Sequence, residues 1–193
     1  MKTLFISTYD EILTIALLSN DNLISLKERT SGRSHSENLL PMIDETLTEN
    51  DILPTDLTEI IVINGPGSFT GIRLGITVAK TLGYTLNIPI KLISALEALA
   101  ISDSNLTKKI IRINDPKGVY YGMFENNTLI GELNYLSNAD FKVFLEDNSD
   151  LVIPGDTKLD VEAINRSLKE KAAINPHEVK AVYIKQIEVM NGS

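Results

Sequence analysis

A glycine-rich segment is the part of the sequence whose residue types and spacing come closest to a known chemistry. The run from Gly65 to Gly71 reads Gly-Pro-Gly-Ser-Phe-Thr-Gly and separates an apolar stretch from a helical pattern. Glycines allow close approach of the backbone, and free N–H groups at a helix start can bind a phosphate. The Lys-Ser/Thr pair of a P-loop is missing, because Ile72 and Arg73 follow the last glycine, and the spacing differs from the dinucleotide-binding fingerprint. The pattern therefore favours a tight strand-to-helix turn over a phosphate site.

The two histidines are the other candidates for chemistry. His35 stands beside Ser36 at the start of a predicted helix, and His177 follows a proline near the C-terminus. Neighbouring residues of a helix point about 100° apart, so His35 and Ser36 form no nucleophile–base pair, and no orienting acid can be identified. The chain has no cysteine, which excludes disulfides, cysteine nucleophiles, thiolate zinc sites and iron–sulfur clusters. We therefore expect no catalytic residue, no metal ligand and no cofactor.

Composition narrows the class of protein further. The chain has 193 residues, 43% of them hydrophobic and 23% charged, which suits one large globular domain or two small ones. Its net charge of −8 has the wrong sign for a protein that binds nucleic acid unaided. The longest apolar stretch, Ile12 to Leu18, is far too short to cross a membrane, and no signal-peptide hydrophobic region follows Met1. We expect a soluble, cytoplasmic protein.

The elements that would position these residues alternate between strands and helices. Three strands open the chain, and Ser34 with Glu37 fits the capping box of a first helix that Pro41 should kink. The second half begins again with three strands after a polar cluster at 102–105. The expected strands are 3–8, 12–18, 23–28, 60–63, 90–93, 110–113, 119–124, 128–135 and 151–153; the expected helices are 34–47, 72–85, 95–101, 140–145 and 161–169; and 182–187 fits either type. This repetition predicts an α/β fold of two related lobes, residues 1–101 and 102–193.

The helix after the glycine-rich segment carries small residues on one face. Gly71, Gly75, Ala79 and Gly83 are spaced by four, and each glycine inside a helix costs about 1 kcal/mol relative to alanine. Such a stripe lets another helix approach closely. Two alternatives are open: the stripe packs on the first helix of the same chain, or it packs on a partner. Both can hold together.

Three segments resemble the TsaB family, also called YeaZ. They are His35–Pro41 (His-Ser-Glu-Asn-Leu-Leu-Pro), Asn64–Gly75 (Asn-Gly-Pro-Gly-Ser-Phe-Thr-Gly-Ile-Arg-Leu-Gly) and Ser94–Leu96 (Ser-Ala-Leu). The match covers roughly the first 100 residues, and the rest agrees only in strand order. The resemblance implies the actin-like ATPase fold of sugar kinases and heat-shock 70 proteins, with two related lobes of mixed sheets flanked by helices.

The resemblance also implies a function. Members of the family are regarded as non-catalytic relatives of the catalytic subunit TsaD. With TsaD and the small ATPase TsaE they act in forming threonylcarbamoyladenosine at position 37 of tRNAs that read codons beginning with A. In such heterodimers the first helix and the helix after the glycine-rich segment pack against their counterparts in TsaD. A homodimer through the same helices is an alternative, and tRNA would be contacted only indirectly. The candidate interface residues are His35, Leu39, Ile43, Gly71, Gly75, Ala79 and Gly83.

Departures from the catalytic relatives argue against catalysis by this chain. The positions of their metal-binding histidine pair are Ala95 and Leu99 here, and Ser7 replaces the aspartate that faces the nucleotide. Only the upstream histidine remains, as His35. At the start of the second lobe the family's Asp-Ala-Arg is replaced by 114–116, Asn-Asp-Pro. The alternatives to a scaffold subunit are a small-molecule kinase or nucleotidase of the same fold, which Ser7 disfavours, and a peptidase, for which no metal pair or activated nucleophile is present.

Overall fold

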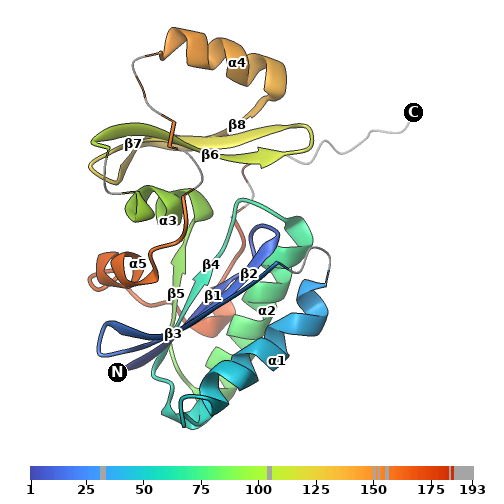
Figure 1. The fold of residues 1–193 in the computed structure, drawn as a ribbon, viewed down its shortest axis with the longest axis vertical. Coiled ribbons are helices and arrows are strands. Elements are labelled where there is room, and N and C mark those ends of the chain that lie inside the picture. The colour runs from blue at the N-terminus through green and yellow to red at the C-terminus, as the bar shows by residue number, and fades with distance from the viewer. Residues whose placement is uncertain are drawn as a thin grey trace.

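Two β-sheets, arranged along the long axis of the molecule, form the framework of the chain (Figure 1). They are seen in a computed structural model that describes residues 1–30, 34–103, 106–149, 151, 153–154, 157–182 and 184. A five-stranded sheet comes from the first half of the chain and a three-stranded sheet from the second. The α/β class expected from the sequence is confirmed.

The first sheet has the strand order β3-β2-β1-β4-β5. The first three strands are antiparallel, whereas β4 pairs in parallel with β1 and β5 with β4. Every residue of β4 is buried, and β1 is buried from its second residue on, which is typical of central strands covered on both faces. The strands are β1 (Lys2–Ser7), β2 (Ile12–Ser19), β3 (Asn22–Thr30), β4 (Glu59–Ile63) and β5 (Ile90–Ile93).

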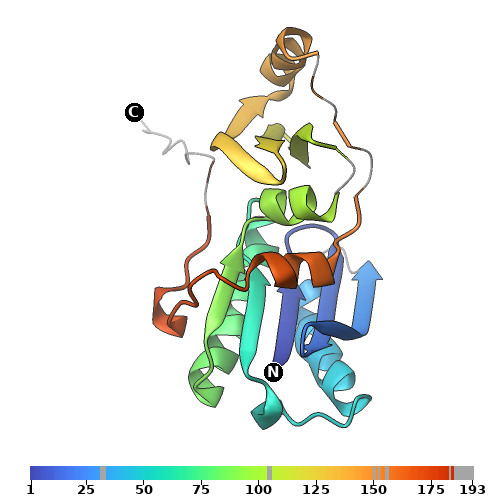
Figure 2. The same cartoon turned by 90° about the vertical axis from the view of Figure 1, so that its left-hand side faces the viewer.

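Helices cover both faces of the first sheet. α1 (His35–Thr48) and α2 (Phe69–Leu86) lie side by side on one face, and α5 (Val161–Ser167) crosses the other (Figures 1 and 2). The short α3 (Ala95–Ser102) lies between the two sheets. A 3-10 turn, η1 (Pro54–Asp56), precedes β4. None of the helices in the described residues has both the length and the apolar composition needed to cross a membrane.

The second sheet is an antiparallel meander of β6 (Lys108–Asp115), β7 (Gly118–Glu125) and β8 (Thr128–Ser137). α4 (Asn138–Asp147) covers one of its faces through a small apolar cluster, in which the ring centroids of Tyr121 and Phe141 are 5.3 Å apart. The other face packs on α3, so that Ile111, Tyr120 and Phe124 join the core of the first sheet. The prediction that both halves open with a three-strand meander is confirmed.

The C-terminal part of the chain returns to the first sheet. α5 contacts α3 and β3, and Ile174 forms an antiparallel bridge to Ile90 of β5. The 3-10 turn η2 (Pro176–Glu178) packs on α2, and the N–H of Val182 donates to the carbonyl oxygen of Asn64 (2.8 Å). The expected division into residues 1–101 and 102–193 therefore does not coincide with the packing of these segments.

The observed elements differ from the predicted ones mainly at their ends. Ser34 precedes α1, but its side chain makes no capping hydrogen bond, so the predicted capping box is wrong. α2 begins three residues earlier than predicted because Ser68 caps it. Neither Leu151 nor Ile153 belongs to a strand, and Val152, the centre of that predicted strand, lies outside the described residues. Most of the predicted element at 182–187 also lies outside them.

Candidate functional site

The glycine-rich segment forms a tight turn that is filled by its own chain. The Ser68 N–H donates to the carbonyl oxygen of Tyr9 (2.7 Å), and the Gly71 N–H donates to Ser68 Oγ (3.2 Å). Gly67 has a φ of +149°, and a Cβ at this position would collide with the backbone of Tyr9. The N–H groups of Ser68 and Gly71 are therefore bonded within the chain. The predicted strand-to-helix turn is confirmed.

The glycines on the small-residue face of α2 lie against the ends of strands rather than against another helix. A Cβ on Gly71 would collide with the carbonyl oxygen of Thr8, and a Cβ on Gly75 with the Thr8 hydroxyl. That hydroxyl donates to the carbonyl oxygen of Gly71 (2.8 Å). Farther along, a Cβ on Gly83 would lie 2.9 Å from Cδ1 of Ile90 in β5. The expected packing of this stripe on the first helix is thus corrected: it lets α2 approach the first sheet.

All seven residues expected at a partner interface are buried within the chain itself. Leu39 and Ile43 are 1% and 5% exposed, because the apolar period of α1 marks the face that packs on the first sheet. In this conformation none of the seven can carry a docking surface, and a partner surface on these helices has to be built from the residues between them. The seven are His35, Leu39, Ile43, Gly71, Gly75, Ala79 and Gly83.

Other residues of α1 and α2 are exposed, and we use the name outer face for five of them: Leu40, Phe69, Arg73, Thr77 and Tyr84. Leu40 is 56% exposed, Phe69 48% and Tyr84 67%. The guanidinium carbon of Arg73 lies 3.7 Å from the centre of the Phe69 ring. Large exposed apolar side chains on adjacent helices are typical of a protein–protein contact. These residues stand outside the apolar period of their helices and are not among the interface residues expected from the sequence.

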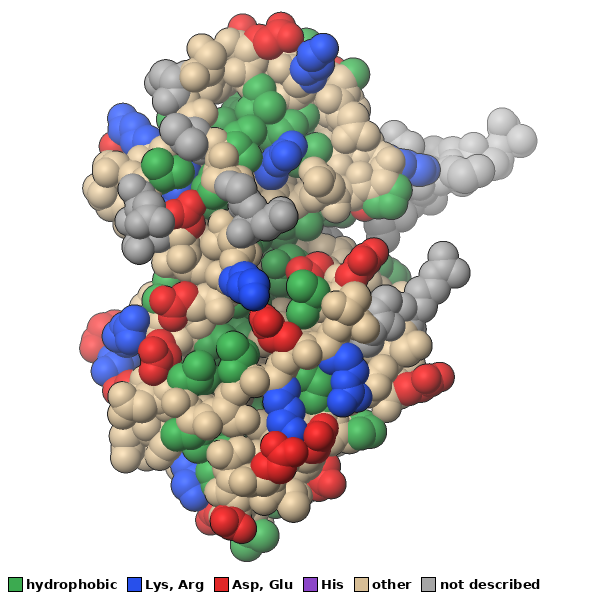
Figure 3. All heavy atoms as spheres, in the orientation of Figure 1, with side chains coloured by type: hydrophobic (Ala, Val, Ile, Leu, Met, Phe, Trp, Pro, Cys, Tyr) green, Lys and Arg blue, Asp and Glu red, His purple; other side chains and the backbone are tan. Residues whose placement is uncertain are grey.

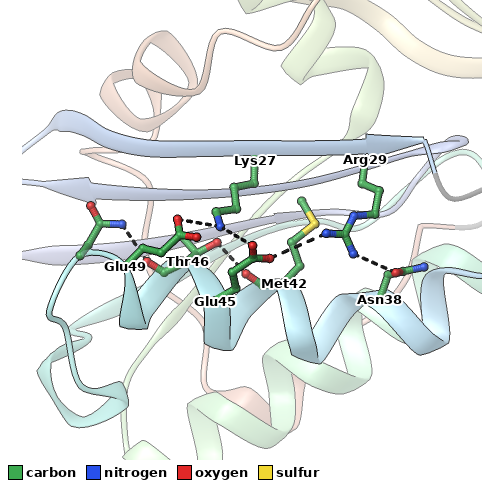
Figure 4. A network of polar contacts seen from close by, with 8 residues as sticks. Lys27, Arg29, Asn38, Met42, Glu45, Thr46 and Glu49 are labelled. Atoms are coloured by element: carbon green, nitrogen blue, oxygen red, sulfur yellow. Dashed lines mark hydrogen bonds and ion pairs between the residues drawn. The ribbon is translucent and has the colours of Figure 1, made fainter.

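Ion pairs hold α1 against the edge strand β3 (Figure 4). Lys27 Nζ lies 3.1 Å from Glu45 Oε1 and 2.8 Å from Glu49 Oε2. Arg29 lies 3.8 Å from Glu45 and donates to Asn38 Oδ1 (3.0 Å). Residues two apart on a strand point to the same face, so both cations of β3 reach the same helix. The network fixes α1, and with it the outer face, relative to the first sheet.

A buried polar group lies where α1 begins. His35 is 6% exposed, and its Nε2 lies 2.7 Å from the backbone oxygen of Asp10. Burial raises the pKa of the neighbouring Tyr9 hydroxyl, and it also raises the pKa of the Asp10 carboxyl, against the opposing effect of the hydrogen bond from the Ile12 N–H (2.9 Å). Burial therefore disfavours the charged forms of the Tyr9 hydroxyl and the Asp10 carboxyl, and the contact of His35 Nε2 with a backbone oxygen joins the start of α1 to the turn after β1.

The three positions that the resemblance aligns with the nucleotide- and metal-binding groups of catalytic relatives are buried. Ser7 and Ala95 are 0% exposed, and Leu99 is 8% exposed. The side chains of Ala95 and Leu99 have no atom that could bind a metal, and Ser7 Oγ has no hydrogen-bond partner among the described residues. In the part of the chain that the structure describes, no three His, Asp or Glu side chains gather as a metal site would require.

Comparison with known proteins decides the family. The tRNA threonylcarbamoyladenosine biosynthesis protein TsaB of Bacillus subtilis (strain 168) is 35% identical over 182 residues, which cover 90% of this chain and 80% of that protein. The chain belongs to the TsaB family. The protein of the same name from Escherichia coli (strain K12) is 34% identical over 100 residues, or 52% of this chain and 43% of that protein. The family model of TsaD, tRNA N6-adenosine threonylcarbamoyltransferase, matches residues 25–120.

Solved structures of the same fold come from Pseudomonas aeruginosa. YeaZ from this organism has a TM-score of 0.80 at 19% identity and covers 94% of this chain and all of its own. An uncharacterized protein with similarity to peptidase YEAZ has a TM-score of 0.79 at 20% identity, covering 95% of this chain and 99% of that one. The likeness concerns the fold alone, and it shows that the chain has the fold of YeaZ.

Proposed function

We propose that the chain is a non-catalytic scaffold and activating subunit of the complex that forms N6-threonylcarbamoyladenosine at position 37 of tRNAs reading codons that begin with A. The observation that carries the proposal is the match to the B. subtilis protein across 90% of the chain. That relative and the E. coli relative are both named for the biosynthesis of this nucleoside. The subunit acts in the cytoplasm, and its net charge of −8 leaves contact with tRNA to its partners.

The residues at three positions support the proposal that the chain does not itself catalyse the reaction. Ser7, Ala95 and Leu99 are buried and replace the groups that bind nucleotide and metal in catalytic relatives. The glycine-rich segment adds to this, since Ser68 and Gly71 use their N–H groups within the chain. The chain therefore contributes to the reaction through assembly rather than through reacting groups.

The outer face is the surface that we propose for the TsaD-like catalytic subunit. Leu40, Phe69 and Tyr84 supply apolar area, while Arg73 stacks on Phe69 and presents a cation beside it. Aromatic residues and arginine are enriched where protein surfaces meet. A TsaE-like ATPase binds to the resulting pair, and in the absence of the catalytic subunit a second copy of this chain can take its place on the same face.

The function is tested by depleting the protein and analysing the nucleosides of bulk tRNA. We expect the threonylcarbamoyladenosine content to fall, and expression of the intact chain to restore it. Undiminished nucleoside in depleted cells would contradict the proposal.

The partner surface is tested by Leu40→Glu. A carboxylate in the middle of an apolar contact must be desolvated without a partner, so we expect the affinity for the TsaD-like subunit to fall by about tenfold or more. Val143→Glu is the matched control, because Val143 is 57% exposed but belongs to α4, which packs on the second sheet. Co-purification and isothermal titration calorimetry measure the difference. Equal binding by the two variants would exclude the outer face.

A further inference from the structure

A segment near the C-terminus, residues 174–182, lies along the edge of the first sheet, and we call it the strap. At one end of the strap, Ile174 exchanges two backbone hydrogen bonds with Ile90 of β5 (2.7 and 3.2 Å). At the other end, the Val182 N–H donates to the carbonyl oxygen of Asn64 (2.8 Å). Asn64 directly follows β4, so the strap runs from the edge of the sheet to the residue before the glycine-rich segment.

Between these two ends the strap packs on the C-terminal half of α2. The ring centroids of His177 and Tyr84 are 5.2 Å apart. Lys80 Nζ lies 3.5 Å from the carbonyl oxygen of His177 and 3.4 Å from that of Val179. The strap therefore contacts the helix that carries all of the outer face except Leu40.

The two flanks of α2 are held by different kinds of contact. On one flank α1 packs on β2 and β3, and Figure 3 shows acidic and basic side chains close together over α1 and β3. On the other flank, the strap forms no ion pair within the described residues. Val179, which is 3% exposed, is the only fully buried residue of the strap. A segment with few buried apolar groups opens at a lower free energy than the core, so we expect the strap to open while the first sheet stays folded.

Opening of the strap changes the surface beside Tyr84. With the strap docked, the exposed His177 ring stands beside Tyr84, which is 67% exposed. With the strap open, Tyr84 stands without this ring. A partner that covers both rings therefore binds the docked state more tightly and shifts the equilibrium toward it. Coupling of this kind is reciprocal, so docking of the strap strengthens the binding of the partner by the same factor.

We propose that the strap and the outer face bind the TsaD-like subunit together. His177 of the docked strap is part of the surface that this subunit covers, and the bound subunit holds the strap on the first sheet. Aromatic side chains are enriched where protein surfaces meet, and His177 extends the aromatic surface of Tyr84. The inference rests on the function proposed above for the outer face.

Hydrogen exchange of the full chain, alone and with the TsaD-like subunit, tests the coupling. The reporter is the amide of Ile174, which donates to the carbonyl oxygen of Ile90 at the sheet edge and lies outside the outer face. We expect its exchange to slow by about tenfold in the complex, while the amides of β8 in the second sheet keep their rates. Unchanged exchange at Ile174, or equal slowing across both sheets, would overturn the coupling.

His177→Ala tests the contact with the partner. Loss of the ring should weaken the affinity for the TsaD-like subunit about fivefold, and His177→Phe, which keeps a ring, should bind nearly as the original chain does. Lys171→Ala is the matched control, because Lys171 is exposed and precedes the strap. Isothermal titration calorimetry measures the affinities, and urea denaturation checks that the variants keep the original free energy of unfolding. Equal affinities of His177→Ala and Lys171→Ala would contradict the inference.

Leu40→Glu separates this inference from the proposal on which it rests. If Leu40→Glu weakens binding and His177→Ala does not, the outer face stands and the strap has no part in it. If neither variant weakens binding, the outer face and the inference both fail. If His177→Ala weakens only the association of two copies of this chain, the surface belongs to a second copy and the inference is wrong.

Discussion

The two halves of the chain begin alike and end differently. Each opens with a three-strand antiparallel meander, β1–β3 and β6–β8, but only the first is extended by parallel strands. The second has α4 on one face and depends on α3, which follows β5 of the first sheet, for the other. The first sheet thus has a core of its own, whereas the second is attached to that core.

The largest expected change in stability lies in the first half, where α2 contacts Thr8, the residue after β1. Gly75→Leu would drive a side chain into the Thr8 hydroxyl, and overpacking of this kind costs about 3 kcal/mol or more. Thr77→Leu, at an exposed position of the same helix, is the control and should change the free energy of unfolding by less than about 0.5 kcal/mol. Urea denaturation measures both. Equal free energies of unfolding for the two variants would mean that the packing around Gly75 adjusts to a larger side chain.

A smaller effect is expected where the second half joins the first, at Lys109. This fully buried lysine donates to the carbonyl oxygens of Ala100 (2.7 Å) and Asp103 at the end of α3, and to Asn127 Oδ1 (2.8 Å). Burial lowers the pKa of Lys109. Lys109→Met leaves these acceptors without a donor, at a cost of about 2 kcal/mol.

Hydrogen exchange measures which part of the molecule loses stability in Lys109→Met. In Lys109→Met, amides of β6–β8 should lose protection before those of the first sheet, because α3 no longer holds the second sheet. Lys108→Met is the control, since its ion pair with Glu125 is exposed. Uniform loss of protection across both sheets would show that the halves unfold as one unit.

The smallest effect is expected from the ion pairs between β3 and α1. Glu45→Gln removes the contacts to Lys27 and Arg29 and should lower the Tm by no more than about 2 °C, because these side chains are partly solvated. The shift should vanish in 1 M salt, where charge interactions are screened. Asp44→Asn, which alters an exposed carboxylate without an ion pair to the described residues, is the control. A Tm shift that persists in 1 M salt would indicate packing rather than charge.

The sequence predicted the fold more completely than the site. The apolar run Ile60–Ile63 identified a central strand correctly, and the glycine-rich segment was correctly predicted to form a strand-to-helix turn. Both features follow from residue patterns that are local in the sequence. The bridge from Ile174 to Ile90 and the return of α5 depend on contacts distant in sequence, which no local pattern reports.

The burial of the residues expected at the partner interface has a physical reason. The regular spacing of Leu39 and Ile43 reports burial, and burial in the chain's own core and burial in an interface look the same in a sequence. Leu40 and Phe69 stand outside the period, and their exposure becomes recognisable only when the helices are placed on the sheet.

The bridge between Ile174 and Ile90 has a consequence for the order in which the protein is made. During synthesis the strands of the first sheet leave the ribosome before the second sheet, but the residues that bridge to β5 and pack beside Gly83 leave only after it. Until then β5 is an uncovered edge strand, the kind that recruits other chains. The first sheet is therefore completed only after the second has been synthesised, and a nascent chain interrupted before residue 174 would expose the edge of β5 to association with other chains.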